Sequence, residues 1–219
     1  MIKVINLIKN FGEKTIFRDT DFVLPDCGLV GIVGESGSGK TTLINLLSLL
    51  DSDYSGEINV DGVNLSRLKK KKREAFRREH FCYVFADSNL LSYLSPEENV
   101  FLPLDFLKGK IDEAKYAALI NDFNLHGLSK RNVDTLSEGE KQRFSVLRAL
   151  MANRSIMVCD EPTAHLDHKN AVLLMKQLKD AASKERILII TTCHDNSLFH
   201  VFDKTFEIKE CKINERKTV

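Results

Sequence analysis

Residues 34–42 carry the clearest chemical signal in the chain and read Gly-Glu-Ser-Gly-Ser-Gly-Lys-Thr-Thr. Glycines let the backbone curl so that successive N–H groups point inward at phosphate oxygens. Lys40 can reach the β- and γ-phosphates of a nucleoside triphosphate, and the Thr41 hydroxyl can ligate Mg²⁺. The residues assigned to this phosphate loop are Gly34, Glu35, Ser36, Gly37, Ser38, Gly39, Lys40, Thr41 and Thr42.

The flanks of the phosphate loop separate this interpretation from an ordinary glycine-rich turn. An apolar run of β type ends at residue 33, and a second apolar run begins at residue 43. The loop therefore stands between a strand and a helix, which is the context in which G-x-x-x-x-G-K-[ST] binds phosphates. The helix adds the positive end of its dipole. The sequence predicts a nucleoside triphosphate as ligand and favours ATP.

Two adjacent carboxylates, Asp160 and Glu161, follow a short apolar run at residues 155–159. Beside a phosphate loop, Asp160 can hold Mg²⁺ through a water molecule, and Glu161 can orient or deprotonate the attacking water. A strand that merely ends in Asp-Glu is the alternative. Together with the loop, the pair predicts phosphoryl transfer with Mg²⁺ as cofactor.

The segment 136–143 reads Leu-Ser-Glu-Gly-Glu-Lys-Gln-Arg and predicts the start of a long helix. Ser137 and Glu140 have the spacing of a capping box. A helix N-terminus also attracts anions, so the segment is a second candidate anion site. One subunit cannot easily point two helix N-termini at one phosphate, which suggests that a partner subunit supplies the second.

The composition is that of a globular protein, with 219 residues, 43% hydrophobic and 29% charged, and a net charge of +1. This charge gives no general attraction to nucleic acid or membrane. No apolar run reaches the roughly 18 residues that a membrane span needs, and five scattered cysteines have no metal-type spacing. Basic residues gather between 67 and 78, which predicts a solvated helix face or, alternatively, contact with anionic lipid headgroups.

The elements that position these residues follow an α/β pattern with a helical interruption. Strands are predicted at 1–9, 15–17, 21–24, 29–33, 55–63 and 81–85. Helices are predicted from Ser95, over 111–123 and from Ser137 to Met151, and then a strand at 155–159, a helix at 169–183 and strands at 186–192, 203–210 and 211–213. We therefore expect one domain over 1–219, with an α/β core from 1–85 and 154–219 and an inserted helical lobe at 86–153.

With these motifs in this order, the chain resembles the ATPase subunit of an ABC transporter over essentially all of its length. Residues 34–41 match the Walker A loop of that family, 156–161 match Walker B with its catalytic glutamate, and 136–140 resemble the LSGGQ signature. Residues 164–167 match the D-loop, His194 matches the switch histidine, and Phe11 falls where the family has an adenine-stacking aromatic. The segments 49–51, 55–57, 61–63, 89–91, 98–100 and 102–104 resemble the ATPase group that serves lipoprotein release, macrolide export and antimicrobial-peptide transport.

The resemblance implies a P-loop NTPase fold with a RecA-like mixed sheet, an antiparallel β subdomain and an inserted α-helical subdomain. Two copies would pack head-to-tail around two ATP molecules, with Ser137 and Gly139 of one copy touching the γ-phosphate held by the other. Asp167 would help tie the two sites together, and His194 would contact the γ-phosphate and the attacking water.

The same resemblance implies partners and a location. The ATP-bound homodimer would drive a separate transmembrane permease from the cytoplasmic face of the cell membrane. A soluble ABC protein acting on DNA or ribosomes is a weaker alternative, because the sequence has no coiled-coil insertion or second cassette. We therefore expect no nucleic-acid partner.

Three residues depart from the family pattern, and one of them, Glu140, stands where the signature has a glutamine. Ala86 stands where the family has a glutamine that reaches Mg²⁺ and couples to the permease, and its methyl can neither ligate nor hydrogen-bond. Glu138 replaces a signature glycine and adds a negative charge near the partner's γ-phosphate, which costs binding unless it points away or is neutralised. We therefore expect weakened hydrolysis with nucleotide binding retained. Two functions stay open: an active Mg-ATPase that powers transport, favoured by Glu161 and His194, and a low-turnover ATP-operated clamp that signals to a membrane partner, favoured by Ala86 and Glu138.

Overall fold

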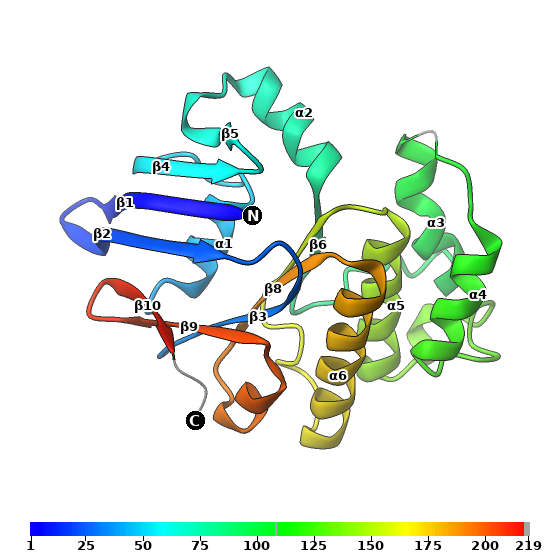
Figure 1. Ribbon diagram of the computed structural model, residues 1–219. Helices are drawn as coiled ribbons and strands as arrows, with labels where there is room; N and C mark the ends of the chain where they lie inside the picture. The colour runs from blue at the N-terminus through cyan, green and yellow to red at the C-terminus, as the bar shows by residue number, and fades with distance from the viewer. Residues whose placement is uncertain (108, 217–219) are drawn as a thin grey trace.

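A six-stranded mixed sheet forms the centre of the fold, with the order β10-β9-β3-β8-β7-β6 (Figure 1). A computed structural model describes residues 1–107 and 109–216 of the chain. The strands are β3 (Gly28–Val33), β6 (Phe81–Val84), β7 (Ile156–Cys159), β8 (Leu188–Cys193), β9 (Lys204–Lys209) and β10 (Lys212–Arg216). All neighbours run parallel except β9 and β10. The apolar runs predicted as strands at 29–33 and 155–159 are confirmed as β3 and β7. Both strands are buried, as is expected of parallel strands that are covered on both faces of a sheet.

A second, antiparallel sheet has the order β2-β1-β4-β5. Its strands are β1 (Ile2–Phe11), β2 (Lys14–Leu24), β4 (Ser55–Val60) and β5 (Val63–Asn64). The prediction of two short strands at 15–17 and 21–24 is wrong, because β2 continues through both. Polar residues hid this continuity from the sequence pattern. Thr20, in the middle, is only 2% exposed, and its hydroxyl accepts a hydrogen bond from the Ile213 amide at 3.1 Å.

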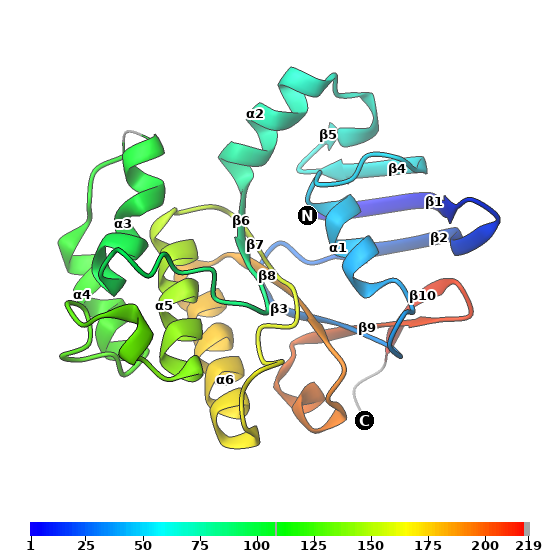
Figure 2. The same ribbon diagram turned by 180° about the vertical axis from the view of Figure 1, so that it is seen from behind.

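Helix α1 (Lys40–Leu47) lies between the two sheets (Figure 2). Its buried side chains Leu43, Ile44, Leu46 and Leu47 belong to a core cluster with residues of β1, β2, β4 and one face of the larger sheet. Burial of each such side chain contributes about 1.5–3 kcal/mol. The helix that follows the phosphate loop is therefore fixed on both sides, and so is the loop that precedes it.

The other face of the larger sheet is covered by helices. Helices α5 (Glu138–Met151) and α6 (His168–Glu185) pack on it, and α3 (Pro96–Leu107) and α4 (Glu113–Asp122) pack on α5. The segments η1 (Leu65–Arg67), η2 (Val133–Thr135) and η3 (Asn196–Val201) are short 3₁₀ turns elsewhere. The helices predicted over 111–123 and 169–183 are confirmed as α4 and α6. Helix α2 (Lys70–His80) carries most of the basic run, buries none of its side chains and stands apart in Figure 1. Within the described ranges, no helix has the length and apolar character needed to cross a bilayer.

The strand register brings the chemically interesting segments to one edge of the larger sheet. Val33 pairs with Cys193, Cys159 pairs with Thr191, and Val84 pairs with Cys159. The carboxyl ends of β3, β6, β7 and β8 are thus nearly level. In open parallel sheets, ligands bind at this edge. The phosphate loop, the Asp160-Glu161 pair and His194 all leave the sheet there.

Candidate functional site

The phosphate loop has a backbone that only glycine accepts at key positions. Gly39 has a φ of 107°, and a Cβ there would lie 2.6 Å from Cγ2 of Ile16. Gly34 has a φ of 151°, and a Cβ there would lie 2.9 Å from the Ile208 carbonyl oxygen. At both positions the φ angle is one that glycine adopts readily, and the space beside the backbone is too small for a side chain. The glycines predicted from sequence are therefore required by the turn itself.

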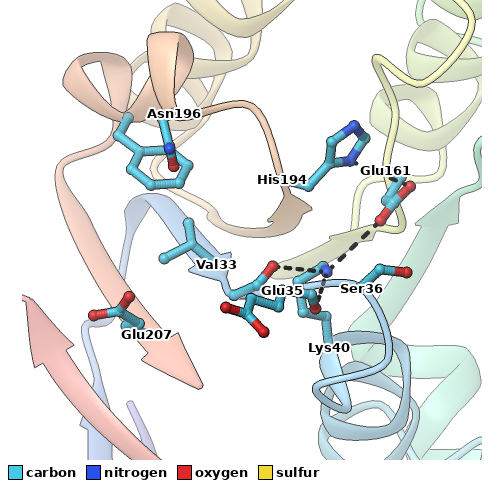
Figure 3. A pocket seen from close by; sticks show the side chains of 10 residues that line it. Val33, Glu35, Ser36, Lys40, Glu161, His194, Asn196 and Glu207 are labelled. Atoms are coloured by element: carbon cyan, nitrogen blue, oxygen red, sulfur yellow. Dashed lines mark hydrogen bonds and ion pairs between the residues drawn. The ribbon is translucent and has the colours of Figure 1, made fainter. Parts of the chain in front are cut away.

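Lys40 begins α1 and folds back over the phosphate loop (Figure 3). Its side chain is 6% exposed, and its ammonium donates hydrogen bonds to the carbonyl oxygens of Gly34 and Glu35, each at 3.0 Å. The same ammonium lies 4.0 Å from a carboxylate oxygen of Glu161. A buried ammonium held only by two carbonyls and one carboxylate is a strong binding group for an added anion.

Thr41 and Asp160 meet at the start of α1. The Thr41 hydroxyl donates to Oδ1 of Asp160 at 3.2 Å, although the two residues are 119 positions apart in the chain. The buried hydroxyl of Thr192, at the end of β8, donates to the same oxygen at 2.8 Å and accepts from the Glu161 amide at 2.8 Å. Thr192 thus positions both carboxylate residues. Sequence reasoning missed it, because a threonine inside an apolar strand has no distinguishing pattern.

Glu161 links the phosphate loop to His194. Its Oε1 faces Lys40, and its Oε2 lies 3.6 Å from Nδ1 of His194. The backbone of Glu161 has a φ of 46°, a left-handed conformation that costs free energy in a non-glycine residue. Strained backbone of this kind gathers at active sites, and the Glu161 side chain lies beside Lys40 of the loop.

These residues enclose a cavity of about 560 Å³. Besides the predicted Gly34, Glu35, Ser36, Lys40, Glu161 and His194, the lining includes Val33, Asn196, Phe199 and Glu207. Figure 3 shows Asn196 and Glu207 across the cavity from Lys40. The sequence analysis missed both. Next to Asn196, Asp195 caps η3 by accepting from the hydroxyl and the amide of Ser197 at 2.7 and 2.9 Å, and these bonds lower the pKa of Asp195. This local cap does not mark Asn196 as a residue of the cavity.

A second cavity of about 510 Å³ lies on the other side of the phosphate loop. It is lined by Lys14, Thr15 and Ile16 of β2, by Gly34 to Ser38, and by the β9–β10 hairpin. Phe11, at the end of β1, lines neither cavity and is 54% exposed. The ammonium of Lys9 lies 4.6 Å from the centre of the Phe11 ring, close enough for a cation–π contact.

Ser137, Gly139 and Asp167 lie together but away from the phosphate loop. Asp167 caps α6 by accepting from the amide and side chain of Asn170, both at 2.8 Å. A Cβ at Gly139 would lie 3.5 Å from the side-chain oxygen of the same Asn170. Among the described residues, no hydrogen bond or ion pair joins these three residues to residues 34–42. Within one chain, the structure does not bring the two predicted anion sites together.

The residues that depart from the family pattern have defined contacts. Glu138 pairs with Lys141, Oε1 to Nζ at 2.9 Å, so its charge is largely compensated. Asp87, next to Ala86, is 82% exposed and lies 3.3 Å from Nε2 of His165. The carbonyl of Phe85 accepts from Gln142 of α5 at 2.8 Å. Asp87 therefore does not replace the absent glutamine side chain in this arrangement.

The fold and the site define a P-loop nucleoside triphosphatase, with the phosphate loop after β3 and paired carboxylates after β7 on the same sheet edge. A family model described as ABC transporter matches residues 17–164. The chain belongs to the ABC transporter family, and it is an ATP-binding and ATP-hydrolysing subunit of that family. The family predicted from the motifs is thereby confirmed.

Individual proteins sharpen this assignment. The chain is 34% identical to the lipoprotein-releasing system ATP-binding protein LolD of Bacteroides fragilis, with 97% of this chain and 100% of that protein aligned. It is also 34% identical to the macrolide export ATP-binding/permease protein MacB of Campylobacter jejuni, of which it spans 33%. The solved dimer of the ATP-binding cassette MJ0796 with ADP and phosphate has a TM-score of 0.84 and 27% identity over 99% of this chain and 98% of that one. The predicted likeness to lipoprotein-release and macrolide-export ATPases is confirmed.

Proposed function

We propose that two copies of this chain close around two ATP molecules and hydrolyse them to drive a separate membrane permease. The observation that carries the proposal is the convergence of Lys40, Glu161 and His194 at one sheet edge, while Ser137 and Gly139 face elsewhere. A site that needs both sets of residues requires a second copy of the chain. The neighbouring structure of MJ0796, a dimer with bound ADP and phosphate, supports this arrangement.

The residues at the start of α1 fit a Mg²⁺ ion that arrives with the nucleotide. Among the described residues, no group of three or more His, Cys, Asp or Glu side chains gathers as a metal site. Mg²⁺ is commonly held by one or two protein groups together with phosphate oxygens and waters. Thr41 and Asp160 would be those groups, with Thr192 orienting the carboxylate. Bound there, Mg²⁺ would neutralise charge that develops on the β- and γ-phosphates.

In the reaction we propose, the residues of the phosphate loop (34–42) hold the triphosphate through their N–H groups and Lys40. Glu161 orients a water against the γ-phosphorus and accepts its proton as the bond to the β-phosphate oxygen breaks. ADP and phosphate leave, and Glu161 returns the proton to solvent. His194 donates to the γ-phosphate oxygens, Ser137 and Gly139 of the second copy contact the same phosphate, and Asp167 links the two sites.

The base of the nucleotide would stack on Phe11. The ring is more than half exposed, and the Lys9 ammonium lies 4.6 Å from its centre. Stacking on an aromatic ring contributes about 0.5–1.5 kcal/mol beyond area burial. Phe11 lines neither cavity. For the base to stack on the ring, either the nucleotide has to extend beyond both cavities or the second copy has to close over the ring.

The permease would dock in a groove of about 480 Å³ between β6, α2, α3 and α5. The floor is apolar, and Phe106 at its edge is 81% exposed. The rim carries Arg77, Arg78, Arg148 and Arg154, and no acidic residue is among the described lining residues. An apolar anchor flanked by carboxylates on the permease would complement this surface. We infer that the chain works at the cytoplasmic face of the membrane, held there by this partner.

The same proposal divides the chain into an α/β core over 1–85 and 154–219 and a helical subdomain over 86–153. The groove lies where these parts meet, so closure of the dimer would move its walls. Slow turnover is a second possibility that one observation favours. Ala86 lacks the amide that would reach the metal, and Asp87 is engaged with His165 instead. In that case the chain acts as an ATP-operated clamp.

Sedimentation of the Glu161→Gln variant tests the dimer. With ATP and Mg²⁺ it should sediment as a dimer, because hydrolysis is blocked and the γ-phosphates of both ATP molecules remain. With ADP, which has no γ-phosphate, it should sediment as a monomer. A monomer with bound ATP would refute the proposal. For the permease contact, Arg78→Glu with Arg154→Glu should abolish co-purification with the permease in detergent and leave the ATPase rate of the isolated chain unchanged. Unchanged co-purification would exclude this groove.

A further inference from the structure

We propose that the carboxylate of Glu140 is a resident competitor for the phosphate that Ser137 binds, and that it sets the ATP concentration at which two chains close. The inference rests on the proposed function, because it concerns the contact between Ser137 and ATP held by a second chain. It assigns to Glu140 a role in tuning nucleotide affinity, beyond its role in starting a helix.

Glu140 occupies both donors that Ser137 offers at the start of α5. Its Oε2 accepts from the Ser137 amide at 2.8 Å and from the Ser137 hydroxyl at 2.9 Å. The hydroxyl oxygen in turn accepts from the Glu140 amide at 3.3 Å. A serine hydroxyl has one proton to donate. A phosphate oxygen can therefore accept that proton only after Glu140 releases it.

Glu140 keeps its charge while it occupies this position. The hydrogen bond from the Ser137 amide lowers the pKa of Glu140, and the Ser137 hydroxyl, Arg143 and Arg131 act in the same direction against partial burial. The carboxylate is therefore ionised at neutral pH. An incoming triphosphate meets a negative charge at the atoms it has to displace. A glutamine here would keep the capping geometry without the charge.

A buried cation behind the same turn shows that this end of α5 favours an anion. Arg143 is 8% exposed, and its Nε and Nη1 have no hydrogen-bond partner among the described residues. A Cβ at Gly139 would lie 3.4 Å from Nη1, so the guanidinium lies directly beneath residues 137–140. Buried unpaired cations favour nearby negative charge. Glu140 supplies that charge when no phosphate is present.

Glu138 is not the competitor, although it is adjacent to Ser137 and also departs from the family signature. Its carboxylate is 60% exposed and paired with Lys141. Neither Ser137 donor is bonded to it. The charge that has to move when phosphate arrives is therefore that of Glu140.

The chain contains a matched control for this proposal. Glu98 closes an equivalent capping box at the start of α3, where its Oε2 accepts from the amide and the hydroxyl of Ser95, both at 2.7 Å. The Ser95 hydroxyl accepts from the Glu98 amide at 3.3 Å, as in the other box. Glu98 has no place in the nucleotide site. Replacing it with glutamine reproduces the structural effect alone.

The experiment uses the full chain with Glu161→Gln, so that ATP is bound and not consumed. Dimer formation is followed by sedimentation velocity as ATP is added at constant Mg²⁺, for this parent and with Glu140→Gln or Glu98→Gln added. Thermal unfolding checks that both glutamine variants are folded. We expect Glu140→Gln to give half-maximal dimer at about fivefold lower ATP, from removal of one like charge, and Glu98→Gln to leave the midpoint unchanged.

Equal midpoints for Glu140→Gln and the parent, or a higher midpoint for Glu140→Gln, would overturn the inference and leave the proposed dimer intact. A shift of the same size in Glu98→Gln would also overturn it, because the effect would then be structural. If all three proteins bind ATP and stay monomeric, the proposed function fails, and this inference fails with it.

Discussion

Glu161 and His194 lie in contact across neighbouring strands, with Oε2 of Glu161 3.6 Å from Nδ1 of His194. The other oxygen of Glu161 faces Lys40 at 4.0 Å. Three groups that a phosphoryl-transfer site needs are thus gathered within one chain. The β7–β8 register, which pairs Cys159 with Thr191, makes this contact possible.

Replacing Glu161 by Gln should lower ATP turnover by at least ~100-fold, the typical contribution of a general base. The amide keeps the size of the side chain and cannot accept the proton of the attacking water. ATP binding should persist, because the phosphate loop is untouched. Phosphate release measures the turnover, and equilibrium binding of a fluorescent ATP analogue measures the ATP affinity. Turnover equal to that of the parent would remove Glu161 from the mechanism.

Ala86→Gln should raise ATP turnover by about tenfold, the lower end of the effect of one residue that supports a metal site. The Phe85 carbonyl accepts from Gln142 at 2.8 Å, and the Asp87 side chain pairs with His165, so neither neighbour supplies the polar group that a glutamine at position 86 would add. Ala86→Leu is the control, since it adds bulk without a polar group. Equal rates for the glutamine variant and the parent would show that position 86 does not limit hydrolysis.

Thr192→Val should reduce the apparent affinity for Mg²⁺ in the ATPase assay and lower turnover about tenfold. The substitution keeps the shape of the side chain and removes the hydroxyl that bonds both Asp160 and the Glu161 amide. Because Thr192 is buried, stability should also fall by about 1–2 kcal/mol. Thr192→Ser retains the hydroxyl and should behave nearly as the parent. Identical Mg²⁺ curves for the valine and serine variants would contradict this role.

Lys9→Met should destabilise the fold by about 2 kcal/mol, because Lys9 is buried and pairs with Asp51 and Asp53 at 2.8 and 3.2 Å. The estimate is discounted because Asp53 is largely exposed. Burial opposes the charge of Lys9, but hydrogen bonds to Asp51 and Asp53 outweigh it and raise its pKa above 10.5. Burial likewise opposes the charge of Asp51, and the bond to Lys9 outweighs it and lowers its pKa below 3.8.

These opposite shifts fix the pH window of the Lys9 contribution. It is complete between the two unfolded-state values of 3.8 and 10.5, is lost in acid as Asp51 takes up a proton, and is lost in base as Lys9 releases one. Urea unfolding of parent and variant across pH checks the difference. A stability difference that stays constant below the folded-state pKa of Asp51 would contradict the ion-pair explanation.

Sequence patterns predicted the parts of the molecule where local spacing carries the information. The phosphate loop, the capping box at Ser137 and the buried strands β3 and β7 each have a signature within about ten residues. Strand β2 was misread because Thr20 is polar, although its hydroxyl accepts a hydrogen bond from Ile213 of β10 in the larger sheet. Burial of a bonded polar side chain depends on tertiary structure, which no local pattern reports.

The site was predictable only where a motif names its members. Thr192 and Glu207 lie near the ends of β8 and β9, and Asn196 begins η3 just after β8. They reach the site because β8 and β9 flank β3, which follows from the strand order. The compensation of Glu138 by Lys141 was left open for a similar reason, since two side-chain conformations decide it. The motifs identified the reaction that the site can perform, and the arrangement of the strands determined which further residues lie at the site.

The central claim is that each ATP site is built from two chains. The most direct test is the rate of Mg²⁺-dependent ATP hydrolysis per chain, measured for the purified protein over a wide range of chain concentration at saturating ATP. We expect a plateau of roughly 0.1 to 10 per second at high concentration, at or below the median for enzymes, and a rate per chain that falls as the protein is diluted and dimers dissociate. A measurable rate per chain that stays constant on dilution to a demonstrated monomer would contradict the account.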